Sequence, residues 1–188
     1  MGDVVPFGGA IWCWLLLALL VGRGADLFST WVATPNLVLE ANPLARWLGW
    51  RWALPLNLLM SLAFAFFPMP AIIIATTSAL VASRNFQQAW VMRTLGEEAY
   101  RDWHVRRLME TPLGLFLGCL GMQNLLMAAI GGVLAWSSVN GDAVAVVPFG
   151  IGVGLIAYAL TVTFYTVLAV WRIRRAENRS AGLPNLME

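Results

Sequence analysis

The chain has 188 residues, of which 60% are hydrophobic and only 12% are charged, about half the charged share of a typical soluble domain. This composition and a mean hydropathy of +0.72 exclude an ordinary water-soluble fold and predict an integral membrane protein. The formal net charge is +2 and every basic residue is arginine, so lysine chemistry of the Schiff-base or P-loop kind is excluded.

Apolar runs separated by turn signals predict five membrane-spanning helices, because about 20 apolar residues are needed to cross the hydrocarbon core of a bilayer. These runs cover residues 9–33, 50–67, 70–94, 112–137 and 144–172. The short Pro68-Met69-Pro70 link predicts a tight hairpin between the second and third spans, and Thr111-Pro112 is typical of a helix start. We therefore expect a single all-α, polytopic transmembrane bundle over residues 1–188.

The arginines predict the orientation of this bundle, because short cytoplasmic loops are enriched in them. If the N-terminus lies outside, the arginines of the connecting segments and of the tail all fall on the inner side: Arg46, Arg51, Arg93, Arg101, Arg106, Arg107, Arg172, Arg174, Arg175 and Arg179. We therefore expect an N-out, C-in protein with a cytoplasmic tail over residues 173–188. The charged and aromatic stretch 96–110 predicts a helix on the inner membrane surface, with a solvated connector as the alternative.

Polar residues inside or beside the apolar spans mark a candidate site, because charges in hydrocarbon are costly. The candidate polar site comprises eight residues: Arg23, Asp26, Thr30, Glu40, Asn42, Arg84, Gln87 and Gln88. The first three recur at spacings of three and four and share one helix face. Interhelical hydrogen bonds of about 0.6 kcal/mol each explain such residues without any function. A hydrated cavity in the inner leaflet is the functional alternative.

Two residues of this set have a second, purely structural explanation. Asn42-Pro43 is typical of a helix start. Glu40, just before that start, is placed to be held by backbone N–H groups and the helix dipole.

Asp26 and Arg84 are expected to form an ion pair. Counted along their helices from the outer boundary, they lie about 22 Å and about 20 Å deep, so their depths match. Arg23, one turn from Asp26, is the competing partner.

Glycines predict where the last two spans pack together. Gly131 lies about six residues before the turn that joins these spans and Gly150 about six residues after it, so antiparallel helices bring the two level. Small residues let backbones approach closely. We expect Gly131 and Gly132 to pack against Gly150 and Gly154.

The order of polar residues between positions 20 and 67 resembles a known family. Asp26 and Ser29-Thr30, then Glu40-x-Asn42-Pro43-Leu44 and Trp47-Leu48-Gly49 before an apolar hairpin, are similar to the DUF5658 family of small bacterial and archaeal membrane proteins. The resemblance implies a multi-pass protein of a prokaryotic plasma (inner) membrane and implies no activity. Members often carry a lysine in the second span, where this chain has Asn57 as its most polar residue.

Known catalytic signatures of intramembrane enzymes are not met. Gly22 to Asp26 is one residue out of register for the aspartyl-protease motif Gly-x-Gly-Asp, and the only histidine, His104, lies in the charged inner segment. A zinc motif of the HExxH type is not present, so we expect no metal, cofactor or nucleic acid.

Three classes of function stay open. The first is an accessory or scaffold subunit that binds the lipid bilayer and either another protein or a second copy of the chain. The second is a small-solute or ion transporter that uses Asp26, Glu40 and Arg84. The third is a lipid-acting enzyme, and the sequence favours the first.

Overall fold

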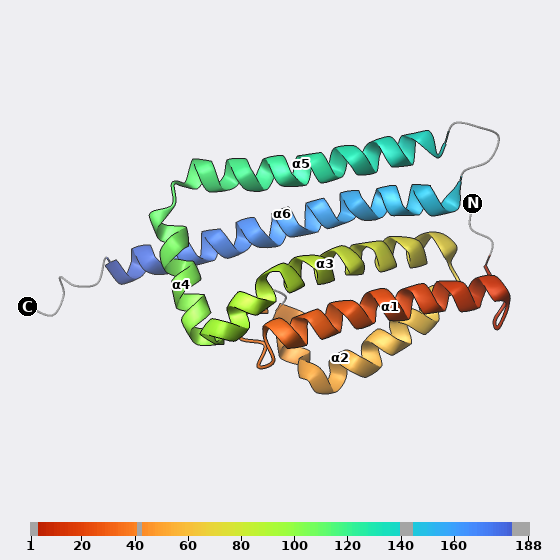
Figure 1. The fold of residues 1–188 in the computed structure, drawn as a ribbon, viewed down its shortest axis with the longest axis horizontal. Helices are drawn as coiled ribbons and strands as arrows, with labels where there is room; N and C mark the ends of the chain where they lie inside the picture. The colour runs from red at the N-terminus through yellow and green to blue at the C-terminus, as the bar shows by residue number, and fades with distance from the viewer. Residues whose placement is uncertain (1–3, 41–42, 140–144, 182–188) are drawn as a thin grey trace, which may run out of the picture.

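The computed structural model describes residues 4–40, 43–139 and 145–181, and these residues form six helices (Figure 1). The helices are α1 (Ala10–Ala33), α2 (Pro43–Phe64), α3 (Pro68–Leu95), α4 (Glu97–Glu110), α5 (Leu113–Ser137) and α6 (Val146–Ala181). Three of them, α1, α5 and α6 as far as Ala176, are long and apolar enough to cross a membrane. The predicted all-helical class is confirmed, and the three apolar helices agree with a membrane protein.

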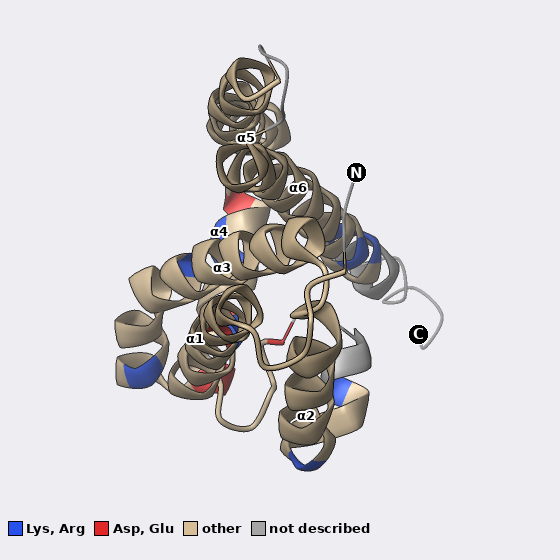
Figure 2. Ribbon diagram, turned by 90° about the vertical axis from the view of Figure 1, so that its right-hand side faces the viewer, with Lys and Arg blue, Asp and Glu red and all other residues tan. Residues whose placement is uncertain are grey.

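The helices stand side by side in a row instead of surrounding a central axis. Seen end-on in Figure 2, α5, α6, α3 and α1 follow one another, and α2 lies beside α1. α3 therefore packs against α1 on one side and α6 on the other, whereas α5 packs mainly against α6. The short helix α4 crosses one end of the row between α3 and α5 (Figure 1). This arrangement leaves long apolar faces of the outermost helices without a protein neighbour in the described chain.

The central position of α3 follows from small residues on its packing surfaces. Its buried positions recur every four or seven residues and so share one face: Ala71, Ser78, Ala82 and Ala89. On the side toward α6, Ile72 and Thr76 fill the space beside Gly150 and Gly154. Small residues on both helices allow close backbone approach, which stabilises helix pairs in membranes where the hydrophobic effect between helices is weak.

Gly131 of α5 packs against α6 as predicted. The other three glycines of that prediction, Gly132, Gly150 and Gly154, do not take part in this contact. A Cβ atom on Gly131 would lie 2.6 Å from the carbonyl oxygen of Gly152, whereas one on Gly132 would meet nothing within 4 Å. Gly150 and Gly154 instead face α3. Matching depth along the helices places Gly150 level with Gly131 but does not determine rotation, and a shift of two residues turns a helix face by about 200°.

The second predicted span is shorter than a full crossing. α2 is interrupted at Gly49, which has a φ of 62° and lies between two helical pieces. The apolar part from Trp50 to Phe64 is about 22 Å long, against about 30 Å for the hydrocarbon core. The predicted start at residue 50 therefore agrees with the break, because glycine adopts positive φ at little cost.

The first part of the tail predicted after residue 172 is helical. α6 continues as a helix to Ala181, because glycine and proline first appear at Gly182 and Pro184. Arg174 on this extension donates to the carbonyl oxygens of Leu108 at 3.1 Å and Thr111 at 2.9 Å. In a continuous helix the Leu108 carbonyl would accept from residue 112, but Pro112 has no N–H. Arg174 thus satisfies carbonyls at the end of α4 and joins the tail to it.

Candidate functional site

The first layer of the candidate site is an ion pair held by three helices. Arg23 Nη1 lies 3.0 Å from Asp26 Oδ2, and the same nitrogen donates to Ser78 Oγ of α3 at 3.1 Å. Arg23 Nε donates to Asn57 Oδ1 of α2 at 2.7 Å, and Arg23 Nη2 also donates to this oxygen. The guanidinium therefore links α1, α2 and α3, and its charge is balanced by a carboxylate of its own helix.

The expected pair of Asp26 with Arg84 is corrected by this geometry, because the ion-pair partner of Asp26 is Arg23. Residues three apart on one helix share a face, so pairing them costs no interhelical arrangement. On α3, Ser78 and Asn85 face α1, and Arg84 is rotated from Asn85 by about 100°. Arg84 is half-buried, and its positive charge opposes the rise that burial causes in the pKa of Tyr100 of α4.

The second layer joins α1 to α3 through hydroxyl groups. Asn85 Nδ2 lies 3.2 Å from both Ser29 Oγ and Thr30 Oγ1. Ser29 is fully buried and also donates to the carbonyl oxygen of Asp26 at 2.9 Å. Thr30 was predicted as a site residue, but Asn85 was missed. The repeat of small residues at Ser78 and Ala82 continues to position 85, and this repeat is the signal that places Asn85 against α1.

The third layer is a loop held by one carboxylate. Glu97, in the first turn of α4, accepts from Thr34 Oγ1 at 2.7 Å, from the N–H of Asn36 at 2.9 Å and from the N–H of Val38 at 3.1 Å. Asn36 Nδ2 donates to the same carboxylate at 3.1 Å. Nothing in the sequence shows which loop Glu97 contacts, since the residues are about 60 positions apart. The sequence therefore places Glu97 only within the charged stretch 96–110.

The same loop is also bound from α2. Trp50 Nε1 donates to the carbonyl oxygen of Pro35 at 2.8 Å, and Arg46 Nη2 donates to that of Glu40 at 2.8 Å. The negative charge of Glu40 repels that of Asp26, so these two predicted site carboxylates lie near each other. Asn42 lies outside the described residues.

The last two predicted residues lie near the end of α3. Gln87 and Gln88 are both exposed, and Gln88 accepts a hydrogen bond from the hydroxyl of Tyr100 at 3.3 Å. The structure thus divides the predicted set. Arg23, Asp26 and Thr30 lie where α1 contacts α2 and α3. Arg84 and Gln88 lie beside Tyr100 of α4.

Hydrogen bonding controls the ionisation of Glu97. Desolvation raises the pKa of this carboxyl group, but the donors of Thr34, Asn36 and Val38 together outweigh it and hold the pKa below the ordinary value of 4.5. A group with a depressed pKa contributes stability that is complete above the pKa of the unfolded chain and is lost as the pH falls through the folded pKa. The loop should therefore stay attached above pH 4.5, weaken as the pH falls below this value, and open only once the pH has passed through the lower pKa of the folded state.

Replacing Glu97 by glutamine should release the loop at neutral pH, because the uncharged amide keeps a single acceptor oxygen for several donors. A hydrogen bond to a charged group contributes about 1.5 to 3 kcal/mol, so the exchange protection of the Asn36 and Val38 amides should fall about 10- to 100-fold. Hydrogen exchange with mass spectrometry measures this. Glu98→Gln, one residue away and outside the hydrogen bonds of the loop, is the matched control. Equal protection in wild type and Glu97→Gln at pH 7 would contradict the prediction.

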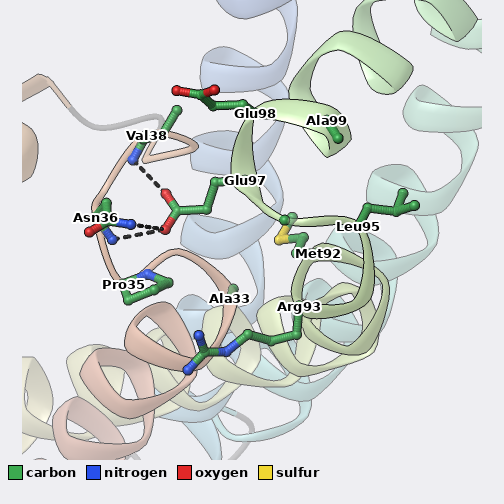
Figure 3. A pocket seen from close by; sticks show the side chains of 11 residues that line it. Ala33, Pro35, Asn36, Val38, Met92, Arg93, Leu95, Glu97, Glu98 and Ala99 are labelled. Carbon is green, nitrogen blue, oxygen red and sulfur yellow. Dashed lines mark hydrogen bonds between the residues drawn. The ribbon is translucent and has the colours of Figure 1, made fainter.

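An open groove of about 670 Å³ lies where this loop meets the junction of α3 and α4 (Figure 3). Its lining is mixed apolar and charged: Ala33, Pro35, Asn36, Val38, Met92, Arg93, Leu95, Gly96, Glu97, Glu98 and Ala99. Among the residues that the structure describes, no group of three or more His, Cys, Asp or Glu side chains is placed to hold a metal ion.

Comparison with protein families, with curated proteins and with solved structures finds no match to this chain. The resemblance to the DUF5658 family over residues 20–67 therefore stays a prediction. The class that the fold defines is an all-helical protein with three helices able to cross a membrane.

Proposed function

We propose that the chain is a multi-pass scaffold or accessory subunit of a prokaryotic plasma membrane. The observation that carries this proposal is the open row of helices, in which α5 has α6 as its main neighbour. Along the free side of α5, large apolar side chains recur at helical spacing and are 58 to 71% exposed: Met122, Leu126, Ile130 and Val133. Such a face fits either another protein or a second copy of the chain.

The transporter alternative depends on Asp26, Glu40 and Arg84 acting as one group. Its support is weakened by the pairing of Asp26 with Arg23, since a carboxylate already balanced by a cation of its own helix is a poor site for a transported cation. Arg23 is further occupied by Asn57 and Ser78. These contacts are those of a structural network that holds three helices together.

Purification in mild detergent tests the scaffold proposal. The full chain should copurify with a protein in constant stoichiometry, or should have the mass of an oligomer. Ile130→Trp on the free face of α5 should abolish this association without lowering the melting temperature. Leu17→Trp, at an exposed apolar position of α1, is the matched control. Association that survives Ile130→Trp, or a lone chain with bound lipid only, would contradict the proposal.

We also propose five membrane crossings with the N-terminus outside, in which the bilayer thins locally around the short apolar part of α2. In support, α1, α2, α3, α5 and α6 all run along the long axis in Figure 1, and α4 lies at the end of the row where α1 and α3 end. The arginines of α4 and of the end of α6 lie at that same end, as expected for the cytoplasmic side.

Cysteine labelling in intact cells should show this topology. On a background without Cys13 and Cys119, an impermeant maleimide should label Val139→Cys but not Asp102→Cys or Ala181→Cys until the cells are opened. All three positions must label in opened cells, which controls for accessibility. Labelling of Ala181→Cys in intact cells would overturn the five-span orientation.

A further inference from the structure

Two charged side chains of the groove have no polar partner among the described residues. Arg93 lies with its guanidinium 5.6 Å from the centre of the Trp31 ring and forms neither a salt bridge nor a hydrogen bond within the described chain. Stacking on a ring leaves the N–H groups of arginine, which lie in the guanidinium plane, able to bind an oxyanion. Glu98 is exposed, and no described residue pairs with it. Figure 3 shows these two residues on opposite sides of Glu97.

The groove lies at the depth of phospholipid headgroups in the proposed topology. If the outer edge of the hydrocarbon core is at Pro68, Arg93 lies about 37 Å along α3, beyond the core of about 30 Å and within the headgroup layer. The end of α1 at Ala33 lies about 35 Å from Ala10. Both walls of the groove therefore reach the inner headgroup layer together.

An aromatic surface connects the groove with the hydrocarbon core. The Trp31 ring, which has the Arg93 guanidinium over it, stacks on Phe28 with ring centres 6.1 Å apart. Phe28 in turn contacts Phe86 of α3, with ring centres 6.0 Å apart. These three side chains are 41 to 56% exposed. Together they form a continuous apolar strip that leads from Arg93 toward the middle of the bilayer, as an acyl chain would.

We propose that this groove binds an ethanolamine phospholipid, with the phosphate on Arg93, the ammonium on Glu98 and an acyl chain on the strip formed by Trp31, Phe28 and Phe86. A primary ammonium donates hydrogen bonds to a carboxylate, which a trimethylammonium cannot do. A choline group is bound by open aromatic faces, whereas the Trp31 ring already has the Arg93 guanidinium over it. The proposal uses the membrane placement described above and does not depend on a protein partner.

Native mass spectrometry of the full chain tests this proposal with ethanolamine, choline and glycerol phospholipids of identical acyl chains. We expect the ethanolamine lipid to be retained about tenfold better than the choline lipid, the effect of one charge-assisted hydrogen bond. Arg93→Gln should lower retention of all three lipids by a similar factor, and Arg93→Lys should restore part of it. Glu98→Gln should remove the preference for ethanolamine over choline while retaining binding through the phosphate.

Controls separate this site from general surface charge and from misfolding. Arg101→Gln and Asp102→Asn change an exposed pair outside the groove and should leave lipid retention unchanged, and all variants should melt as wild type does. Soluble phosphoethanolamine should compete only weakly, because it lacks the acyl chain. Equal retention of the three lipids, a preference for the glycerol lipid, or full competition by soluble phosphoethanolamine would overturn the proposal. A missing protein partner would not affect it.

Discussion

Replacing Gly131 by alanine should separate α5 from α6, while Gly132→Ala should leave the pair intact. A Cβ atom at Gly131 would lie 2.6 Å from the backbone oxygen of Gly152 and 2.9 Å from Cβ of Leu155. Neither atom is the end of a flexible side chain, so the helices must move apart. Overpacking of this kind costs about 1 to 3 kcal/mol, and the loss should appear as a lower melting temperature in detergent.

The comparison of adjacent glycines makes this result specific. Both substitutions add one methyl group and remove one helical glycine, so their effects on helix propensity are alike. The reciprocal change Gly152→Ala should be equally harmful, because its Cβ would lie 2.5 Å from the oxygen of Gly131. If Gly131→Ala and Gly132→Ala melt at the same temperature, the close approach of α5 and α6 at these residues is wrong.

Replacing Arg23 by glutamine should destabilise the protein by about 3 kcal/mol, the cost of an unpaired charge inside a membrane helix. The change leaves Asp26 without its ion-pair partner and removes the links to Asn57 and Ser78. α2 should loosen first, since Asn57 is the polar contact that joins it to Arg23. Unfolding in detergent, with cysteine crosslinking between α1 and α2, measures both effects.

Two further variants decide which arginine is the partner of Asp26. Arg23→Gln combined with Asp26→Asn should recover part of the loss, because neither buried charge remains. Arg84→Gln should have a much smaller effect, since Arg84 forms no salt bridge with Asp26. A larger loss from Arg84→Gln than from Arg23→Gln would show that the interhelical pair exists and that Arg23 is not the partner.

Composition and the spacing of apolar runs were sufficient to predict an all-helical protein and the positions of its helices. Apolar length determines whether a helix can form inside a membrane, and proline and glycine mark its ends locally. The helix over Glu97–Glu110 lies within the predicted stretch 96–110, whereas α3 begins at Pro68, two residues before its predicted start, and α2 begins at Pro43, seven residues before its predicted start. Arg23 and Asp26 form an ion pair within α1, because residues three apart lie on the same face of a helix.

Contacts between helices required the tertiary structure, because they depend on the rotation of each helix about its axis. Equal depth suggested Arg84 for Asp26 and Gly150 for Gly131, and both were wrong: Asp26 pairs with Arg23 of its own helix, and Gly131 faces Gly152. Glu97 shows the same limit for loops. Its carboxylate acquires its donors only when α4 is placed beside the loop after α1, and a residue distant in sequence carries no local sign of that contact.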